Sequence, residues 1–432
     1  MITIRHYLPT IETINNWIAT RRFRQIAGNT LLLLAGTAIS QVLLLLTLFL
    51  TARYLGVDVY GQYAASFVLL GQAAVILNFG LDTWLLREGA RLAQTVSRKV
   101  SDALLIKLLI AAPWFVIVAG LATQLNPDVY LPPVIAIAAI GVILQTIGTL
   151  AQAAFKSQLR NQTTFWLQII GNITLLILTL LLIQRGATLL DFIWARTLAW
   201  LVLAGVGLYF LIRAFGIQLR LQSLKPVVRQ STSFFLADAL GYVYGTADLT
   251  IVAIWLGKTA AGLYAPAVTL INAAFIIPNT IHSVVLPVIA RAYHENRQAA
   301  RLPSIMLILG LMLEGAIIAG ATFVLARPII LLIFGSDFLE SAPILSILSI
   351  VLFLKALNFA LGTILTAIDR QRDRVVAQAF VAVGNVALNL WVVGRYGLVG
   401  VAWVYVFTEF CLVIGYGWFV FKNTRRFTFA LS

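Results

Sequence analysis

The chain has 432 residues, of which 61% are hydrophobic and only 11% are charged. Soluble domains carry roughly 45–50% apolar and about 25% charged residues, so this composition excludes a soluble globular protein. The formal net charge of +15 could indicate a nucleic-acid partner, but the cations cluster between long apolar runs, which indicates membrane orientation and no nucleic acid.

Long uncharged runs such as 30–52 and 134–154 predict membrane-spanning helices, because about 20 apolar residues cross the hydrocarbon core. These runs are too long for the strands of a membrane barrel, which alternate over about 10 residues. Residues 1–24 lack the apolar core of a cleavable signal peptide. We expect an all-α integral membrane fold with twelve transmembrane helices, at about 28–52, 60–84, 103–123, 131–155, 164–184, 190–212, 231–256, 260–289, 303–325, 343–367, 375–393 and 398–421.

The 31 Lys and Arg residues test this layout. When they are assigned to the connections between the expected helices, most of them fall in alternate connections. Positive residues concentrate on the cytoplasmic side of a membrane. We therefore expect an even number of crossings with both termini cytoplasmic.

Two stretches of the chain repeat one phrase. Residues 54–64 read YLGVDVYGQYA and residues 255–265 read WLGKTAAGLYA, 201 positions later. Gly171-Asn172 and Gly384-Asn385 form a second pair of landmarks. The repeats predict two parallel six-helix repeats around a central cavity. The expected organisation is a cytoplasmic segment 1–27, a first lobe 28–213, a cytoplasmic linker 214–230, a second lobe 231–421 and a cytoplasmic tail 422–432.

The repeated phrase itself fits a hairpin on the outer side. Gly56 and Gly257 follow apolar helices, where glycine commonly ends a helix. Gly61 permits a tight re-entry into the membrane, and Tyr63 and Tyr264 are expected at the interface, where amphipathic rings are favoured. We favour this geometric role over a direct chemical one.

Ionisable residues within the expected spans mark functional candidates, because each costs about 2.5–3.5 kcal/mol near the bilayer centre on insertion scales. The seventh helix carries polar residues along one helical stripe, and the repeat maps this stripe onto polar positions of the first helix. Two such stripes would line a water-filled cavity; a Gly-x-x-x-Gly packing face is the alternative. The candidates are Asp238, Tyr242 and Asp248 in the seventh helix and Thr37, Ser40 and Thr47 in the first.

Three further cations could hold a phosphate or pyrophosphate group. Arg53, Arg196 and Lys355 lie within or at the ends of expected helices, and an arginine can bind phosphate oxygens through two parallel bonds. The alternative for each is an internal ion pair, for example with Glu314 or Glu409, which are also candidates for ion coupling.

Other chemistry finds little support in the sequence. Lys107 lies near a helix end and is expected to reach the interface. No paired Cys or His spacing predicts a metal site, and the single cysteine, Cys411, excludes an intramolecular disulfide. No soluble segment is long enough for a catalytic domain. We therefore expect no enzyme activity, no metal and no cofactor, and transport driven by the substrate gradient, an ion gradient or the membrane potential.

Several motifs resemble those of a known family. TARYLGVDVYGQYA and LNFGLDTWLLREGAR resemble the first two helices of bacterial oligosaccharide and polysaccharide flippases of the O-antigen type, in the multidrug/oligosaccharidyl-lipid/polysaccharide exporter superfamily. IILLIFGSDFLESAPILSIL, LTAIDRQRD, VGNVALNL and YGLVGVAWVYV extend the resemblance through the second half. The motif positions that match are Arg53, Gly56, Gly61, Asp82, Arg87 and Glu88.

This resemblance implies an alternating-access flippase in the bacterial cytoplasmic membrane. Its substrate would be a polyprenyl-pyrophosphate-linked oligosaccharide used in polysaccharide or lipopolysaccharide biosynthesis, and its partners would be membrane lipid and, as candidates, a polysaccharide polymerase and glycosyltransferases. A cation-coupled drug antiporter of the same superfamily stays open, because Asp238 and Asp248 are compatible with it. A membrane polymerase or ligase is disfavoured by the short outer loops.

Overall fold

The computed structural model describes residues 21–91, 95–217, 224–295 and 298–425, and within these ranges the chain forms helices and no strand. The all-α class is therefore confirmed. In chain order the elements are α2 (Arg21–Asn78), α3 (Leu81–Arg91), α4 (Val96–Leu125), α5 (Pro132–Ser157), α6 (Asn161–Gln184), α7 (Leu189–Phe215), α8 (Leu224–Ala274), α9 (Ile276–Glu295), α10 (Arg301–Ile333), the 3-10 helix η3 (Ser336–Phe338), α11 (Ser341–Ala367) and α12 (Gln371–Arg425).

Within the described ranges, nine helices are long and apolar enough to cross a membrane. Three long elements, α2, α8 and α12, each contain one glycine with non-helical backbone angles: Gly56 (φ 72°), Gly257 (φ 84°) and Gly397 (φ 58°). Glycine tolerates positive φ because it has no Cβ. The glycines expected to end helices in the repeated phrase therefore do interrupt them. We call the end of the molecule that carries these three bends the glycine end.

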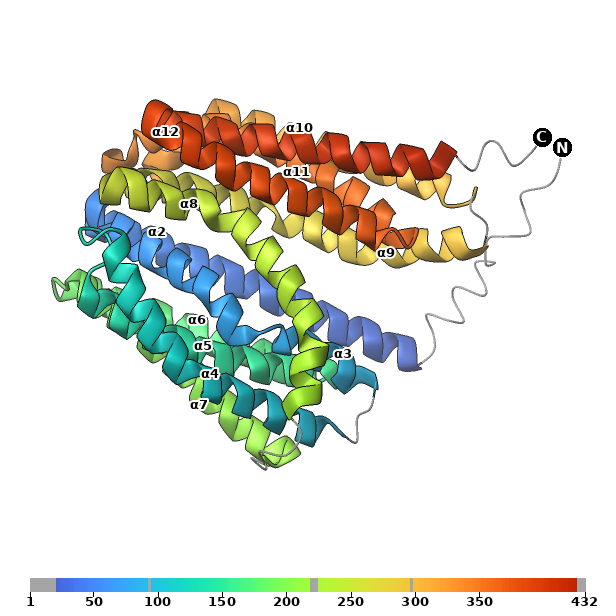
Figure 1. Cartoon of the computed structure of the whole chain (residues 1–432), viewed down its shortest axis with the longest axis horizontal. Coiled ribbons are helices and arrows are strands. Elements are labelled where there is room, and N and C mark those ends of the chain that lie inside the picture. Colours follow the sequence, from blue (N-terminus) through green and yellow to red (C-terminus); the bar gives the residue numbers. More distant parts are fainter. Residues whose placement is uncertain (1–20, 92–94, 218–223, 296–297, 426–432) are drawn as a thin grey trace.

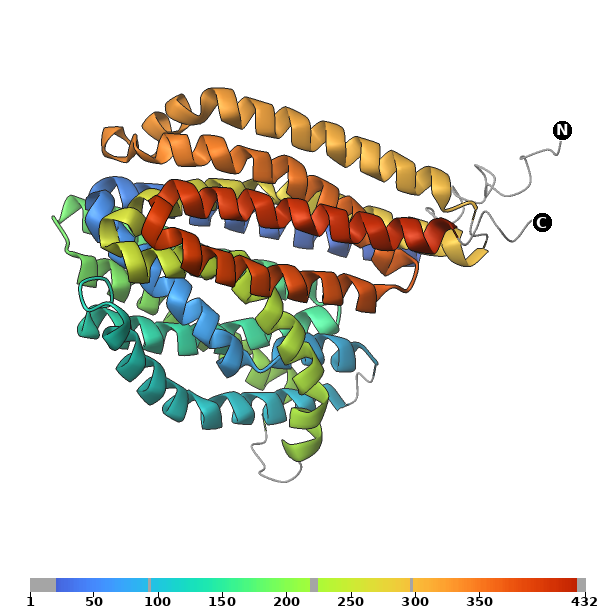
Figure 2. The same cartoon turned by 45° about the horizontal axis from the view of Figure 1, so that its top comes forward.

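The helices form two groups (Figures 1 and 2). The first helix group (α3–α7) packs against α2, and the second helix group (α9–α12) packs against α8; α2 and α8 also pack against each other. Buried apolar side chains form three clusters. One cluster is shared by both groups, one is confined mainly to the first group, and one is confined to the second. The shared cluster contains the residues around the bends, such as Tyr60, Val252 and Tyr405.

This distribution of buried surface divides the molecule along its length. At the glycine end the two groups share one apolar core, while toward the opposite end each group has its own core. Burial of apolar area is the main favourable term in helix packing. The groups are therefore held together most firmly at the glycine end.

Two interruptions move helix boundaries from the expected positions. The second expected helix, 60–84, stops at Asn78 because Phe79 (φ 45°) and Gly80 (φ 66°) are both left-handed. The eighth, 260–289, is divided at Phe275 between α8 and α9, next to Pro278. Proline has no N–H for the helix ladder, which explains the position of this break.

The first half of α8 crosses toward the first helix group, as Figure 1 shows. The Nε1 of Trp84 in α3 donates to Oε1 of Gln230 at 3.0 Å. Phe79 stacks on Phe235 with ring centroids 4.9 Å apart. Because α8 ends in the second group, it connects the two groups physically as well as in sequence.

Candidate functional site

The two copies of the repeated phrase contact each other at the glycine end. A Cβ atom added at Gly61 would overlap the carbonyl oxygen of Lys258, and one added at Gly262 would overlap the carbonyl oxygen of Val57. Gly262 and Lys258 each lie 201 positions after Gly61 and Val57, so the contact is reciprocal, as at a two-fold axis. Gly61 therefore allows close approach of the two copies, where the sequence suggested a tight re-entry.

A side-chain contact repeats the same relation. Thr259 Oγ1 donates to Asp58 Oδ1 at 2.7 Å, across 201 positions of sequence. Lys258 Nζ lies 4.0 Å from the other carboxylate oxygen of Asp58, and both side chains are largely exposed. Exposed pairs of this kind contribute about 0–1 kcal/mol. The close backbone approach at the two glycines is therefore the stronger constraint on this contact.

Tyr63 and Tyr264, which occupy matching positions in the two copies of the phrase, are buried, so their expected interfacial position is wrong. Each hydroxyl has an internal charged partner. The Nη1 of Arg196 donates to the Tyr63 hydroxyl at 3.1 Å, and the Tyr264 hydroxyl donates to Asp248 Oδ2 at 2.7 Å. Buried tyrosine hydroxyls usually find such a partner. Tyr63 and Tyr264 thus occupy the same position of the repeat, but Tyr63 contacts an arginine and Tyr264 contacts an aspartate.

Arg196 lies in a cluster of aromatic rings. Its guanidinium carbon is 4.3 Å from the ring centroid of Phe67, 5.0 Å from Trp200 and 5.7 Å from Tyr63. Tyr63 and Phe67 are one turn apart on α2, and Arg196 and Trp200 are one turn apart on α7, so each helix presents its pair on one face. We call these four residues the arginine cage. It was not expected from the sequence, because the rings come from distant segments.

The described part of the chain supplies no counter-ion to the arginine in this cage. No described carboxylate lies within salt-bridge distance of Arg196, and its Nε atom is buried without a hydrogen-bond partner. Aromatic faces attract the cation but accept few hydrogen bonds. A partly buried guanidinium of this kind is suited to an incoming anion, and its planar fork matches phosphate oxygens.

Lys355 is placed differently from the other candidate cations. Its Nζ lies 3.7 Å from Glu409 Oε1 and 4.5 Å from the ring centroid of Phe275. Glu409 is buried and accepts from Asn358 Nδ2 at 2.7 Å. Lys355 and Glu409 therefore form the internal ion pair that the sequence left open as the alternative to substrate contact.

The expected stripe of the seventh helix divides into two environments. Asp238 and Tyr242 are exposed, and Asp238 Oδ2 accepts from Thr83 Oγ1 in α3 at 3.4 Å. Asp248 is buried, and besides Tyr264 it accepts from the Leu249 N–H at 2.8 Å. The first half of the stripe therefore faces open space, while its last member belongs to the packed interior.

The matching stripe of the first helix divides in a similar way. Thr37 is exposed, and Ser40 is buried with a hydroxyl that has no partner. Thr47 is buried and donates to the Leu43 carbonyl oxygen of its own helix at 2.8 Å. The exposed members of both stripes lie away from the glycine end.

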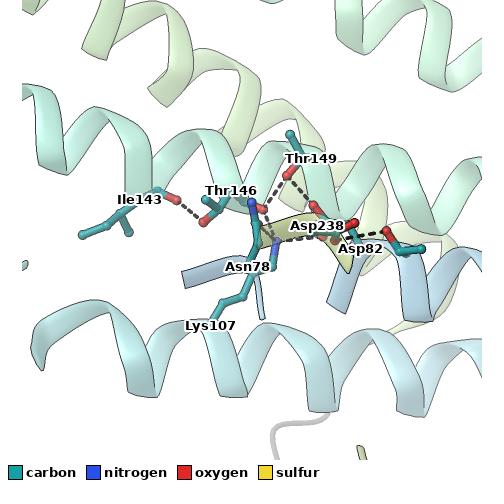
Figure 3. Close-up of polar contacts among 8 residues, drawn as sticks. Asn78, Asp82, Lys107, Ile143, Thr146, Thr149 and Asp238 are labelled. Carbon is teal, nitrogen blue, oxygen red and sulfur yellow. Dashed lines mark hydrogen bonds and ion pairs between the residues drawn. The ribbon is translucent and has the colours of Figure 1, made fainter. Parts of the chain in front are cut away.

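Lys107 does not reach the interface, so that expectation is wrong (Figure 3). Its side chain is 2% exposed, and Nζ donates to Asn78 Oδ1 at 2.8 Å, Asp82 Oδ1 at 2.7 Å and the Thr146 carbonyl oxygen at 2.7 Å. The other Asp82 oxygen accepts from Thr149 Oγ1 at 2.7 Å. All three donors of the ammonium group are used. Asp82 thus ties the break between α2 and α3 to α4 and α5.

The remaining motif positions lie at the two ends of the molecule. Arg87 is exposed, with its guanidinium carbon 5.8 Å from the Phe234 ring centroid. Glu88 pairs with Arg91 at 3.3 Å. Arg53 is exposed near the glycine end, with Nη1 3.5 Å from the carbonyl oxygen of Leu332 at the end of α10. Arg53 is therefore well separated along α2 from the exposed stripe positions.

Comparison of the chain with known proteins gives two matches in sequence. The family described as "polysaccharide biosynthesis protein" matches residues 50–343. A probable low-salt glycan biosynthesis flippase of Haloferax volcanii is 26% identical over 373 residues, which cover 81% of this chain and 74% of that protein.

Two solved structures show the same fold. An inward-facing multidrug resistance MATE family transporter of the MOP superfamily superposes with a TM-score of 0.77 at 14% identity, covering 90% of this chain and 96% of that one. The lipid II flippase MurJ in an inward closed conformation superposes with a TM-score of 0.68 at 17% identity, covering 90% and 87%. At these identities the likeness concerns the fold.

Proposed function

We propose that this chain, which belongs to the polysaccharide biosynthesis protein family, is a flippase that moves a polyprenyl-pyrophosphate-linked oligosaccharide across the membrane by alternating access. The observation that carries this proposal is Arg196, a partly buried guanidinium that is held by three aromatic rings and has no carboxylate partner among the described residues. A pyrophosphate supplies the missing negative charge and several acceptor oxygens. The likeness to a probable low-salt glycan biosynthesis flippase supports a glycan as part of the cargo.

The proposed arrangement has twelve crossings in two parallel six-helix lobes, 28–213 and 231–421. In it α2, α8 and α12 each cross the membrane twice, turning at their bent glycines. The reciprocal contact of Gly61 and Gly262 supports an axis along the membrane normal between the lobes. The distribution of cations favours cytoplasmic positions for segments 1–27, 214–230 and 422–432 in a bacterial inner membrane, with the glycine end outside.

The proposed cycle begins from an inward-facing state. The shared core at the glycine end and the separate cores toward the opposite end support this assignment, as does the likeness to an inward-facing transporter. The pyrophosphate enters from the inner leaflet and binds Arg196, while the glycan lies against the exposed polar stripe that includes Thr37, Asp238 and Tyr242. Rocking of the lobes then separates the two copies of the repeated phrase and opens the outer side.

Arg196→Ala tests the proposed substrate contact. Losing a hydrogen bond to a charged group costs about 1.5–3 kcal/mol, so we expect the Kd for a short polyprenyl pyrophosphate to rise about 10- to 150-fold. The assay is binding to purified protein in lipid nanodiscs. Arg196→Lys should retain part of the affinity, because the charge stays but the planar fork is lost.

A matched control comes from another arginine on an aromatic ring. Arg395 lies 4.9 Å from the Trp391 ring centroid and is exposed, so Arg395→Ala should leave binding unchanged. Equal affinity of wild type and Arg196→Ala would remove the basis of the proposal. Binding of an organic cation, independent of Arg196, would favour the drug-antiporter alternative.

The lipid-linked glycan and membrane lipid are the partners that this function requires. Glycosyltransferases that build the glycan and a polymerase that extends it would act before and after transport, and both are proposed partners. Co-purification of either class with the tagged chain is the corresponding measurement.

A further inference from the structure

A corner of the second helix group reaches across to α2 at the glycine end. Between α10 and α11 the chain turns at Gly335 (φ 100°) and enters η3. The turn brings Phe334 and Phe338 together, with ring centroids 5.7 Å apart. Both side chains are buried in the core that the two groups share.

These two rings contact α2 on either side of its bend. Phe334 packs edge-on against Phe49 with ring centroids 5.1 Å apart, and Phe338 packs edge-on against Tyr60 at 6.0 Å. Aromatic pairs favour such arrangements at centroid separations of about 4.5–7 Å. Phe49 precedes the bend at Gly56 and Tyr60 follows it. The corner therefore contacts both arms of the helix that contributes two rings to the arginine cage.

Tyr60 extends this contact to the arginine cage. Its ring stacks on Tyr63, with centroids 6.2 Å apart and 20° between the ring planes, because residues three positions apart on a helix are neighbours. The Tyr63 hydroxyl in turn accepts from Nη1 of Arg196 at 3.1 Å. A continuous series of contacts thus leads from Phe338 to Arg196. We call Phe338, Tyr60 and Tyr63 the ring column.

The ring column is not a feature of the repeat. The position that corresponds to Tyr60, 201 residues later, is Ala261, which is buried and has no ring. Tyr264, the counterpart of Tyr63, donates to Asp248 instead. The second hairpin forms with a methyl group at this position, so hairpin geometry alone does not require an aromatic residue there. The ring is present in the copy that leads to Arg196.

Tyr63 helps to set the direction of the Arg196 guanidinium. A guanidinium binds phosphate oxygens best through two parallel N–H bonds, so its orientation affects its affinity for an anion. Tyr63 accepts one of the five N–H groups and leaves others for a ligand. Protein interiors have few voids, so a ring that shifts displaces its neighbour. Tyr60 and Phe338 therefore limit the positions that the Tyr63 ring can take.

We propose that Tyr60 and Phe338 are positioning residues for Arg196, and that closure of the glycine end completes the arginine cage. Phe338 belongs to the second helix group and Arg196 to the first, so the ring column spans the contact between the groups. When the groups separate at the glycine end, Tyr60 loses Phe338 and the Tyr63 ring is no longer held. The affinity for pyrophosphate then falls in the state that releases it. This affinity change rests on the proposed flippase function, whereas the positioning of the guanidinium does not.

NMR spectroscopy of the purified full chain in lipid nanodiscs, with isotope-labelled arginine, tests the positioning without any ligand. The guanidinium signal of Arg196 is identified by its loss in Arg196→Ala, and the surrounding rings make it sensitive to geometry. Phe338→Leu and Tyr60→Leu should each shift the signal. Tyr60→Phe keeps the ring and should leave the signal in place. An unshifted signal in both leucine variants would overturn the proposal.

Phe155→Leu is the matched control. Phe155 is buried like Phe338 and packs against Phe215 with ring centroids 5.4 Å apart, but it lies in the separate core of the first group. This variant loses the same kind of ring contact without touching the ring column, so the Arg196 signal should not move. An equal shift in the control would show general loosening of the fold and would refute the role of the ring column.

Binding of a short polyprenyl pyrophosphate tests the consequence for the substrate. Phe338→Leu should raise the Kd about 2- to 12-fold, the range expected for losing one aromatic pair. Adding Tyr60→Leu should change the Kd little further, because both residues act through Tyr63. An unchanged Kd in both single variants would refute the link to the substrate. Failure of the wild type to bind the probe would instead refute the flippase function, and the NMR result would still decide the positioning.

A cross-link separates positioning from simple closure. In a Cys411→Ser background, a disulfide formed in the variant with Asp58→Cys and Thr259→Cys holds the glycine end closed, because the wild-type side chains touch at 2.7 Å. Phe338→Leu should weaken binding in the cross-linked protein as well. If cross-linked proteins with and without Phe338→Leu bind equally, Phe338 only stabilises the closed state, and the positioning role is wrong.

Discussion

The reciprocal contact at the glycine end makes a sharp prediction for Gly61→Ala. The new methyl group would overlap the carbonyl oxygen of Lys258, and backbone cannot rotate out of the way as a flexible side chain can. Overpacking of this kind costs typically about 1–3 kcal/mol. Because the contact joins two helix groups that have separate cores elsewhere, we expect this energy to shift the groups apart and leave each group folded.

The size of the shift follows from that energy. A destabilisation of about 1–3 kcal/mol lowers the population of the closed outer contact about 5- to 150-fold relative to an open one. Gly262→Ala should act equally, because the two glycines are equivalent in the repeat. The double variant should be less than additive, since separation caused by the first methyl group also makes room for the second.

Disulfide formation between two introduced cysteines measures the closed population. Asp58 and Thr259 touch at 2.7 Å, so Asp58→Cys with Thr259→Cys should cross-link readily, and adding Gly61→Ala should slow the reaction. Gly120→Ala is the matched control, because a Cβ there would meet nothing within 4 Å. If Gly61→Ala cross-links as fast as the control, the contact does not hold the outer side closed.

Three further predictions concern the buried pair of Lys107 and Asp82, the exposed pair of Lys258 and Asp58, and the arginine cage. Lys107→Met should lower the free energy of unfolding by about 3 kcal/mol, as measured by denaturation in detergent. This is the lower end of the range for breaking a buried pair, because Asp82 is 26% exposed. If the double variant Lys107→Met with Asp82→Asn recovers stability, the lone carboxylate causes the loss. Lys258→Met, at an exposed pair 4.0 Å apart, should change stability by less than about 1 kcal/mol. Phe67→Leu should weaken binding of polyprenyl pyrophosphate only a few-fold. Its cation–π contact, of about 0.5–2 kcal/mol, positions the guanidinium of Arg196 without touching the anion. A loss of affinity as large as that of Arg196→Ala would contradict this role.

Much of the fold was predictable because it depends on local patterns. Apolar run length identifies membrane helices, and glycine at the repeated positions identified the bends at Gly56 and Gly257, where the structure has positive φ. The break at Phe79 was not expected, because a non-glycine residue with positive φ has no clear sequence signal; a neighbouring glycine, Gly80, was the only local indication.

The candidate site was predictable only as a set of charges. Sequence position could name Arg196, Lys355 and Asp248 as intramembrane charges, but not their partners. The structure places Lys355 beside Glu409, and among the described residues it gives Arg196 no carboxylate partner. This difference depends on which helices are neighbours, and it changes the expected role of each cation.

The sequence by itself determined that this protein is a helical membrane protein, that its two halves share a repeated phrase, and which few residues carry charge within the apolar runs. These properties follow from composition, periodicity and chain order, which need no knowledge of contacts. Only the tertiary structure decided that the two phrases meet at their glycines, that Lys107 is buried with Asp82, and that Arg196 sits among aromatic rings. Each of these contacts joins segments far apart in the chain, and their energies depend on distances of a few ångströms that only packing of the helices sets.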